Sequence, residues 1–98
     1  MKLVYAPAAL RDIDEILAYI HHRSPTGAGK VSLAIERAVC ICAQNPGIGS
    51  MTDEPGVYRA PLSRYRYTIS HRVNAERGAV EIGRVVHASR VRHLATQP

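Results

Sequence analysis

The chain has 98 residues, a formal net charge of +5 and a sequence pI near 9.7. That length suits one domain, 1–98, in which one layer of helices on one sheet exhausts the core. No segment approaches the roughly 20 apolar residues that cross a bilayer, which excludes a membrane-spanning protein. The first residues lack the apolar stretch of a signal peptide, so we expect a cytoplasmic protein.

Positive charge is concentrated in the last part of the chain. From Tyr58 onward there are eight arginines and two acidic residues, whereas residues 1–57 hold five basic and six acidic residues. This asymmetry predicts a basic surface that meets an anionic partner, either nucleic acid or a protein that works on it. Arginine outnumbers lysine eleven to two; it suits phosphates and carboxylates but cannot act as a general base near neutral pH.

The chain begins with a predicted strand and helix. Residues 2–5 form a short β-type run, and Pro7 suits the first position of a helix because its missing N–H costs nothing there. Apolar residues then recur at helical spacing up to residue 20. Acidic residues at 12–15 come early and basic residues at 21–23 come late, an order that the helix dipole favours.

A second helix is predicted after Ser24 and Pro25, which supply its cap and its first-turn proline, and residues 45–47 (Asn-Pro-Gly) stop it. Cys40 and Cys42 lie two apart on this helix, so their side chains diverge and a disulfide between them is not expected. A zinc site needs more ligands than this pair offers. We therefore expect two buried structural cysteines, and no metal or cofactor.

The second half of the chain changes to a period of two. Residues 48–56 read as a loop, and strands are predicted at 57–62, 64–73 and 79–90, the last two joined by a turn at 74–78. Alternation in the second strand puts its tyrosines on one face and its arginines on the other. We therefore interpret the tyrosines as core-edge residues rather than as a platform on which RNA bases stack.

These elements predict an α+β fold: an N-terminal strand, an αα-hairpin, and then a three-stranded antiparallel sheet with the helices packed on one face. The opening strand must join that sheet to satisfy its backbone hydrogen bonds.

Six short segments follow one another along the chain in a characteristic order: residues 6–20, 24–25, 45–49, 56–59, 64–67 and 80–90. Together they resemble the small toxins of the ParE/RelE superfamily, from bacterial type II toxin–antitoxin pairs, over nearly the whole chain. The ending R-V-x-H-x-x-R at residues 84–90 is similar to the ParE branch rather than the RNA-cleaving RelE branch.

The resemblance implies a RelE/ParE-like toxin fold and a cytoplasmic poison whose target is DNA gyrase. It also implies a cognate antitoxin, ParD-like or other, encoded beside the toxin. The resemblance further implies that operator DNA is bound mainly through the antitoxin in the complex.

We expect the toxin to bind gyrase with its basic sheet and C-terminal segment and to block turnover of the cleaved-DNA intermediate. The residues expected at that surface are Arg64, Arg66, Arg84, His87, Arg90 and Arg92.

A ribosome-dependent mRNA endonuclease is the alternative function, and it would use His87, Arg64 and Arg84. Such chemistry needs a second acid–base group, and Glu81 lies six residues before His87 on the same predicted strand, ~20 Å away. His87 would otherwise end a strand and hydrogen-bond a nearby group. We therefore expect an inhibitor that acts by binding, without catalytic residues; a small basic nucleic-acid-binding module is a third possibility.

Two helices rarely cover a four-stranded sheet completely, and an uncovered groove would suit an amphipathic segment of the antitoxin. Apolar residues of the first helix are candidates for that interface, although they could equally belong to the core: Leu10, Ile13, Leu17 and Ile20.

Overall fold

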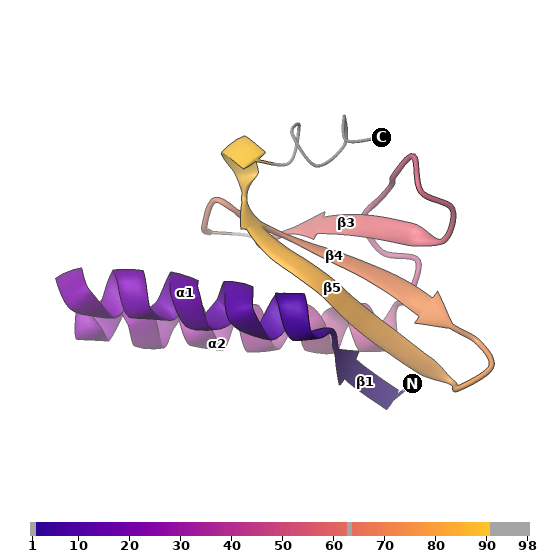
Figure 1. Ribbon diagram of the computed structural model, residues 1–98, viewed down its shortest axis with the longest axis horizontal. Coiled ribbons are helices and arrows are strands. Elements are labelled where there is room, and N and C mark those ends of the chain that lie inside the picture. The colour runs from indigo at the N-terminus through magenta and orange to yellow at the C-terminus, as the bar shows by residue number, and fades with distance from the viewer. Residues whose placement is uncertain (1, 63, 91–98) are drawn as a thin grey trace.

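The computed structural model describes residues 2–62 and 64–90. Its elements, in chain order, are β1 (Lys2–Tyr5), α1 (Pro7–Arg23), α2 (Pro25–Gln44), β2 (Ser50–Met51), β3 (Val57–Pro61), β4 (Tyr67–Asn74), β5 (Ala79–His87) and a 3₁₀ turn (Ala88–Arg90). The two helices form a hairpin that lies along one face of the sheet (Figure 1). The predicted α+β fold is therefore confirmed.

The sheet has five strands in the order β1-β5-β4-β3-β2. The opening strand joins it as expected, but β1 pairs with β5 in parallel, so the sheet is mixed rather than purely antiparallel. The extra strand, β2, pairs with Tyr58 and Arg59 of β3. Two residues are too few to show a period of two, which is why the sequence predicted only a loop there.

The helix boundaries follow from local chemistry. Pro7 and Pro25 occupy first-turn positions of α1 and α2. Ser24 serves both helices: its N–H donates to the Ile20 carbonyl at 2.7 Å, and its Oγ accepts the Gly27 N–H at 3.0 Å. Asn45 ends α2. Neither described helix combines the length and apolarity needed to cross a bilayer.

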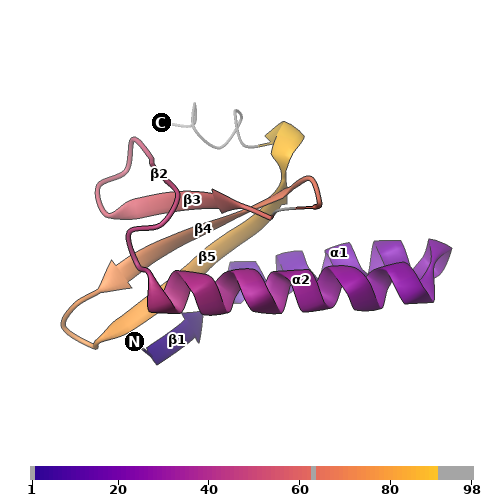
Figure 2. The same ribbon diagram turned by 180° about the vertical axis from the view of Figure 1, so that it is seen from behind.

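The core lies mainly between α2 and the two central strands. Buried residues recur at helical spacing along α2: Ala28, Val31, Ile35, Val39 and Cys42. All of these except Ala28 belong to one core cluster with Ile69, Val80, Ile82 and Val85 of β4 and β5. In α1 only Ala9 is fully buried. Figures 1 and 2 show that the turn end of the hairpin extends past the strands, so the sheet covers only part of each helix.

Three predictions about individual residues were wrong. The strand expected at 64–73 begins only at Tyr67, because Pro61 pairs with Thr68 and the chain bends at residues 64–66 before β4 starts. The alternation of Arg64, Tyr65 and Arg66 therefore belongs to a bend and not to a strand. The last strand ends at His87 rather than at residue 90. Of the two cysteines only Cys42 is buried, and Cys40 is exposed.

Candidate functional site

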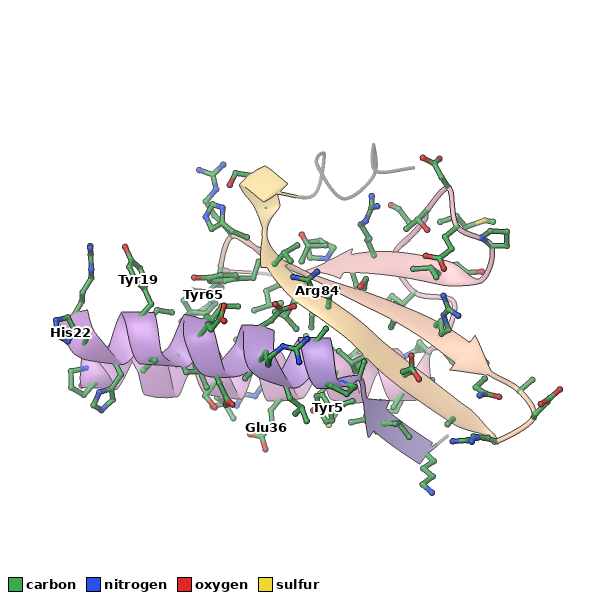
Figure 3. All side chains as sticks on the ribbon, viewed as in Figure 1. Tyr5, Tyr19, His22, Glu36, Tyr65 and Arg84 are labelled. Atoms are coloured by element: carbon green, nitrogen blue, oxygen red, sulfur yellow. The ribbon has the colours of Figure 1, made fainter. Side chains whose placement is uncertain are left out.

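Arg84 owes its position to a bulge in β5. Ser70 pairs with Arg84 while His71 pairs with Ile82, so Gly83 has no partner on β4. Strict alternation after Ile82 would aim Arg84 into the core, but the extra residue puts Val85 there instead. Arg84 is consequently half-exposed on β5, at the point where Figure 3 shows that strand passing α1.

Asp12 of α1 binds this bulged segment through three hydrogen bonds. Arg84 donates from Nε to Oδ2 at 2.7 Å and from Nη2 to Oδ1 at 3.1 Å, and the Val85 N–H donates to Oδ2 at 2.9 Å. Hydrogen bonding to Asp12 raises the pKa of Arg84 above its ordinary value. Because β1 pairs with β5 only as far as Ile82, the Asp12 carboxylate binds β5 backbone that lies beyond the reach of β1.

The C-terminal end of β5 places His87 opposite Tyr67 and the following Ala88 against the backbone of Arg66. His87 pairs with Tyr67 across the strands, the two rings meeting edge to face with centroids 5.6 Å apart. The Ala88 N–H donates to the Arg66 carbonyl at 2.7 Å. Ser89 donates its N–H to His87 Nδ1 at 3.2 Å, with its hydroxyl 2.8 Å from the same atom. That contact assigns the ring proton to Nε2.

The other predicted target-binding residues are spread more widely. Arg64 is exposed on the connection between β3 and β4, immediately before the half-buried Tyr65. The backbone of Arg90 ends the 3₁₀ turn next to His87. The side chain of Arg90 and the whole of Arg92 lie outside the part of the chain that the structure describes.

The apolar residues of α1 divide into two groups. Ile13, Leu17 and Ile20 are half-buried and pack against the core cluster. Leu10 is 50% exposed. Of the four residues expected to bind the antitoxin, Leu10 therefore has the most surface to offer, and the other three contribute to the core.

A groove of about 610 Å³ that the sequence did not predict runs between α2 and the end of β3. Leu33 and Ile41 of α2 line it, each 45% exposed, together with Ile48 from the loop after α2. Lys30, Arg37 and Arg64 also line it. The signal was present in the sequence as large apolar residues of α2 that lie off its buried face, at positions 33 and 41.

Family comparison decides what kind of protein carries these surfaces. The family described as "ParE toxin of type II toxin-antitoxin system, parDE" matches residues 3–92. The chain belongs to this family. No curated protein matches the chain significantly by sequence.

Solved structures agree with that assignment. This ParE-family toxin is similar to a chain of the chromosomal ParDE toxin–antitoxin system of Pseudomonas aeruginosa, with 26% identity and a TM-score of 0.77 over 89% of this chain and 95% of the other. Isolated RelE toxin of Escherichia coli gives 16% identity and a TM-score of 0.64, over 89% and 83% of the two chains. The intact E. coli RelBE complex gives the same identity and score, over 89% and 95%.

His71 is a further titratable residue that the sequence analysis missed. It is 1% exposed on β4, stacks on Tyr58 with ring centroids 5.8 Å apart, and donates from Nε2 to the Pro46 carbonyl at 3.2 Å. Its Nδ1 is buried without a hydrogen-bond partner. Burial lowers the pKa of His71 below its ordinary 6.5. This histidine fastens the end of α2 to the sheet and takes no part in the basic surface.

Among the described residues, no three His, Cys, Asp or Glu side chains gather closely enough to hold a metal ion. His21 and His22 lie in the last turn of α1. Basic side chains in the last turn of a helix interact favourably with the negative end of the helix dipole, as the order of charges in the sequence indicated.

Proposed function

We propose that this ParE-family toxin inhibits DNA gyrase by binding it, acts in the cytoplasm, and is neutralised by its antitoxin. The observation that carries the proposal is the match to the ParE toxin family over residues 3–92. The greater similarity to the Pseudomonas ParDE chain than to the RelE chains supports the same branch.

The surface we propose for gyrase is the end of the sheet at the Tyr67–His87 pair, together with Arg66 and Arg64. We propose Arg90 and Arg92 as further contacts of the C-terminal segment. Arg64 and Arg66 are exposed, and a guanidinium makes strong charge-assisted hydrogen bonds with carboxylates. His87 keeps Nε2–H as a donor because Nδ1 is occupied by Ser89. Recognition of an acidic surface on gyrase by these groups requires no proton transfer.

Arg84 has a different part in the proposal. Its guanidinium is bound to Asp12, so much of its charge is compensated before any partner arrives. Its side chain is 43% exposed, which still allows contact with a target. We propose that Arg84 contributes mainly by holding β5 against α1, and through β5 the position of His87.

A RelE-like mRNA endonuclease is the second candidate, favoured by the fold shared with E. coli RelE. His87 and Arg66 would then meet the scissile phosphate, with arginines stabilising its negative charge. Glu81 is the only carboxylate in the described β5, and it lies opposite Arg72 of β4 in the strand register. The antiparallel ladder puts that pair six positions away from His87, at the other end of the strand.

The deciding experiment compares gyrase inhibition and RNA cleavage by the same purified toxin. Wild type is expected to inhibit supercoiling and to leave ribosome-bound mRNA intact. Arg66→Glu should weaken inhibition about tenfold or more, because a cation at the contact becomes an anion. Arg77→Glu, an equal charge reversal in the turn between β4 and β5, is the control and should change inhibition less than twofold.

Two results would contradict the proposal. Unaffected gyrase together with transcripts cut within codons, and loss of cutting in His87→Ala, would establish the endonuclease. Binding to DNA or RNA without either activity, weakening steeply as salt rises, would establish the nucleic-acid-binding module instead.

A further inference from the structure

The 3₁₀ turn Ala88–Arg90 brings one residue back onto the ring of His87, the last residue of β5 (Figure 1). Ser89 contacts that ring twice: its N–H donates to Nδ1 at 3.2 Å, and its hydroxyl oxygen lies 2.8 Å from the same atom. Because a backbone N–H can only donate, Nδ1 is an acceptor, and the Ser89 hydroxyl must donate to it as well. Two donors of one residue therefore share the lone pair of Nδ1.

Two neighbouring contacts fix where the ring and the turn lie. Tyr67 lies opposite His87 in the strand register, and the two rings meet edge to face. The Ala88 N–H donates to the Arg66 carbonyl at 2.7 Å, which ties the start of the turn to the backbone just before β4. The His87 ring is thus held at its face or edge by Tyr67 and at Nδ1 by Ser89.

Nε2 is the ring atom that these contacts leave for a partner. It carries the ring proton because Nδ1 accepts. Among the described residues, no group forms a hydrogen bond with His87 Nε2, and His71 Nδ1 is the one buried polar side-chain atom left without a partner. His87 therefore presents one N–H donor, and contacts within the chain set its direction.

The same contacts restrict the chemistry of His87. A general base must offer a lone pair to the proton that it removes. The lone pair of Nδ1 is shared by the two Ser89 donors and Nε2 carries the proton, so neither nitrogen is free to accept. Held in this way, the ring is a hydrogen-bond donor, and it fits an oxygen acceptor on a partner.

We propose that Ser89 is a positioning residue of the target-binding surface: it holds His87 as the Nε2–H tautomer, so that the ring donates to an oxygen acceptor of gyrase. This inference rests on the gyrase inhibition proposed above and adds the residue that orients the donor. Ser89 acts through His87 and needs no contact of its own with the target.

The first test reads the His87 tautomer directly, by proton–nitrogen NMR correlations of the ring in purified toxin. Wild type should carry the proton on Nε2. Ser89→Ala removes the shorter of the two contacts to Nδ1, so the share of the Nδ1–H tautomer should rise. Ser89→Thr keeps a hydroxyl and should restore the wild-type spectrum. A wild-type ring with its proton on Nδ1, or a ring spectrum that Ser89→Ala leaves unchanged, would overturn the inference.

The second test measures gyrase inhibition by the same variants. Ser89→Ala should weaken inhibition about fivefold, the effect of one lost neutral hydrogen bond, whereas Ser89→Thr should stay within about twofold of wild type. Ser50→Ala, an exposed serine of β2, is the matched control and should have no effect. In a His87→Ala background, Ser89→Ala should cause no further loss, because the ring through which it acts is gone. Additive losses would make Ser89 a direct contact and contradict its positioning role.

Two replacements of His87 identify the atom that the target binds. The amide nitrogen of glutamine reaches about as far from the backbone as Nε2, whereas that of asparagine reaches only about as far as Nδ1. His87→Gln should therefore retain more inhibition than His87→Asn. Equal losses in the two variants would mean that the target does not bind Nε2.

These measurements separate this inference from the proposed function. If wild-type toxin leaves gyrase active, the proposed function fails, and the NMR comparison still decides whether Ser89 sets the His87 tautomer. If gyrase is inhibited equally by wild type and by Ser89→Ala, the proposed function stands and the role of Ser89 is wrong.

Discussion

Asp12 and Arg84 are 72 residues apart in the chain and form a two-pronged ion pair that joins α1 to the bulged part of β5. The Asp12 side chain is 13% exposed, and it also accepts the Val85 N–H. Removal of this carboxylate leaves a guanidinium and a backbone N–H without their shared partner. Asp12→Ala should therefore lower the free energy of unfolding by about 2–3 kcal/mol, measured by urea denaturation.

Asp14→Ala on the same helix is the control, because Asp14 is exposed; it should change the free energy of unfolding by no more than about 0.5 kcal/mol. In a double-mutant cycle with Arg84→Met, the effects of the two substitutions should not add. Additive effects would mean that the pair contributes no coupling energy.

His71 should make stability depend on pH. Its pKa in the folded protein lies below the ordinary 6.5 because burial disfavours the charged ring. As pH falls through about 6.5 the unfolded chain takes up a proton that the folded protein refuses, so stability falls with pH and is fully present above that value. The contribution of one proton is at most about 1.4 kcal/mol per pH unit.

Unfolding midpoints measured between pH 7.5 and pH 5 would reveal this dependence. His71→Leu should flatten the curve in that window, although the variant is less stable throughout because the Pro46 carbonyl loses its donor. His22→Leu, at an exposed position on α1, should leave the slope as it is in wild type. An unchanged slope in His71→Leu would assign the pH dependence to another group.

Local rules made part of this fold predictable. Pro7, Ser24 and Asn45 bound the helices because capping depends on neighbours within one turn, and the charge asymmetry indicated a basic end. The bulge at Gly83 was not predictable, because it is defined by pairing with a strand that lies elsewhere in the chain. Because the sequence does not reveal this bulge, it does not predict the Asp12–Arg84 pair either, and Arg84 is indistinguishable in sequence from the other arginines of the basic surface.

Segment 64–66 illustrates the opposite error. Alternation of Arg64, Tyr65 and Arg66 imitates a strand, but the pairing of Pro61 with Thr68 makes these residues part of a connection. Exposed Leu33 and Ile41 had a signal in the sequence, because both are large apolar residues that lie off the buried face of α2.

The two cysteines should react at very different rates. Cys40 is exposed, whereas Cys42 is 1% exposed and burial raises the pKa of its thiol. A thiolate is the reactive form, so burial slows Cys42 both by blocking access and by disfavouring ionisation of its thiol. Native protein should consume one equivalent of a thiol reagent promptly and a second only after unfolding. Cys40→Ser should abolish the prompt phase; its persistence would mean that Cys42 is reached in the folded state.

Gly49 should be the glycine least tolerant of substitution. An alanine there would have to adopt a φ near +91° and would overlap the Arg59 carbonyl at the same time. Gly49→Ala should therefore lower the free energy of unfolding by about 2 kcal/mol or more and loosen β2, measured by urea denaturation and hydrogen exchange of Tyr58 and Arg59. Gly47→Ala, two residues earlier with open space around its Cβ, is the matched control and should be close to neutral. Equal stability of the two variants would show that the loop after α2 yields to the added methyl group and does not hold Ile48 in place.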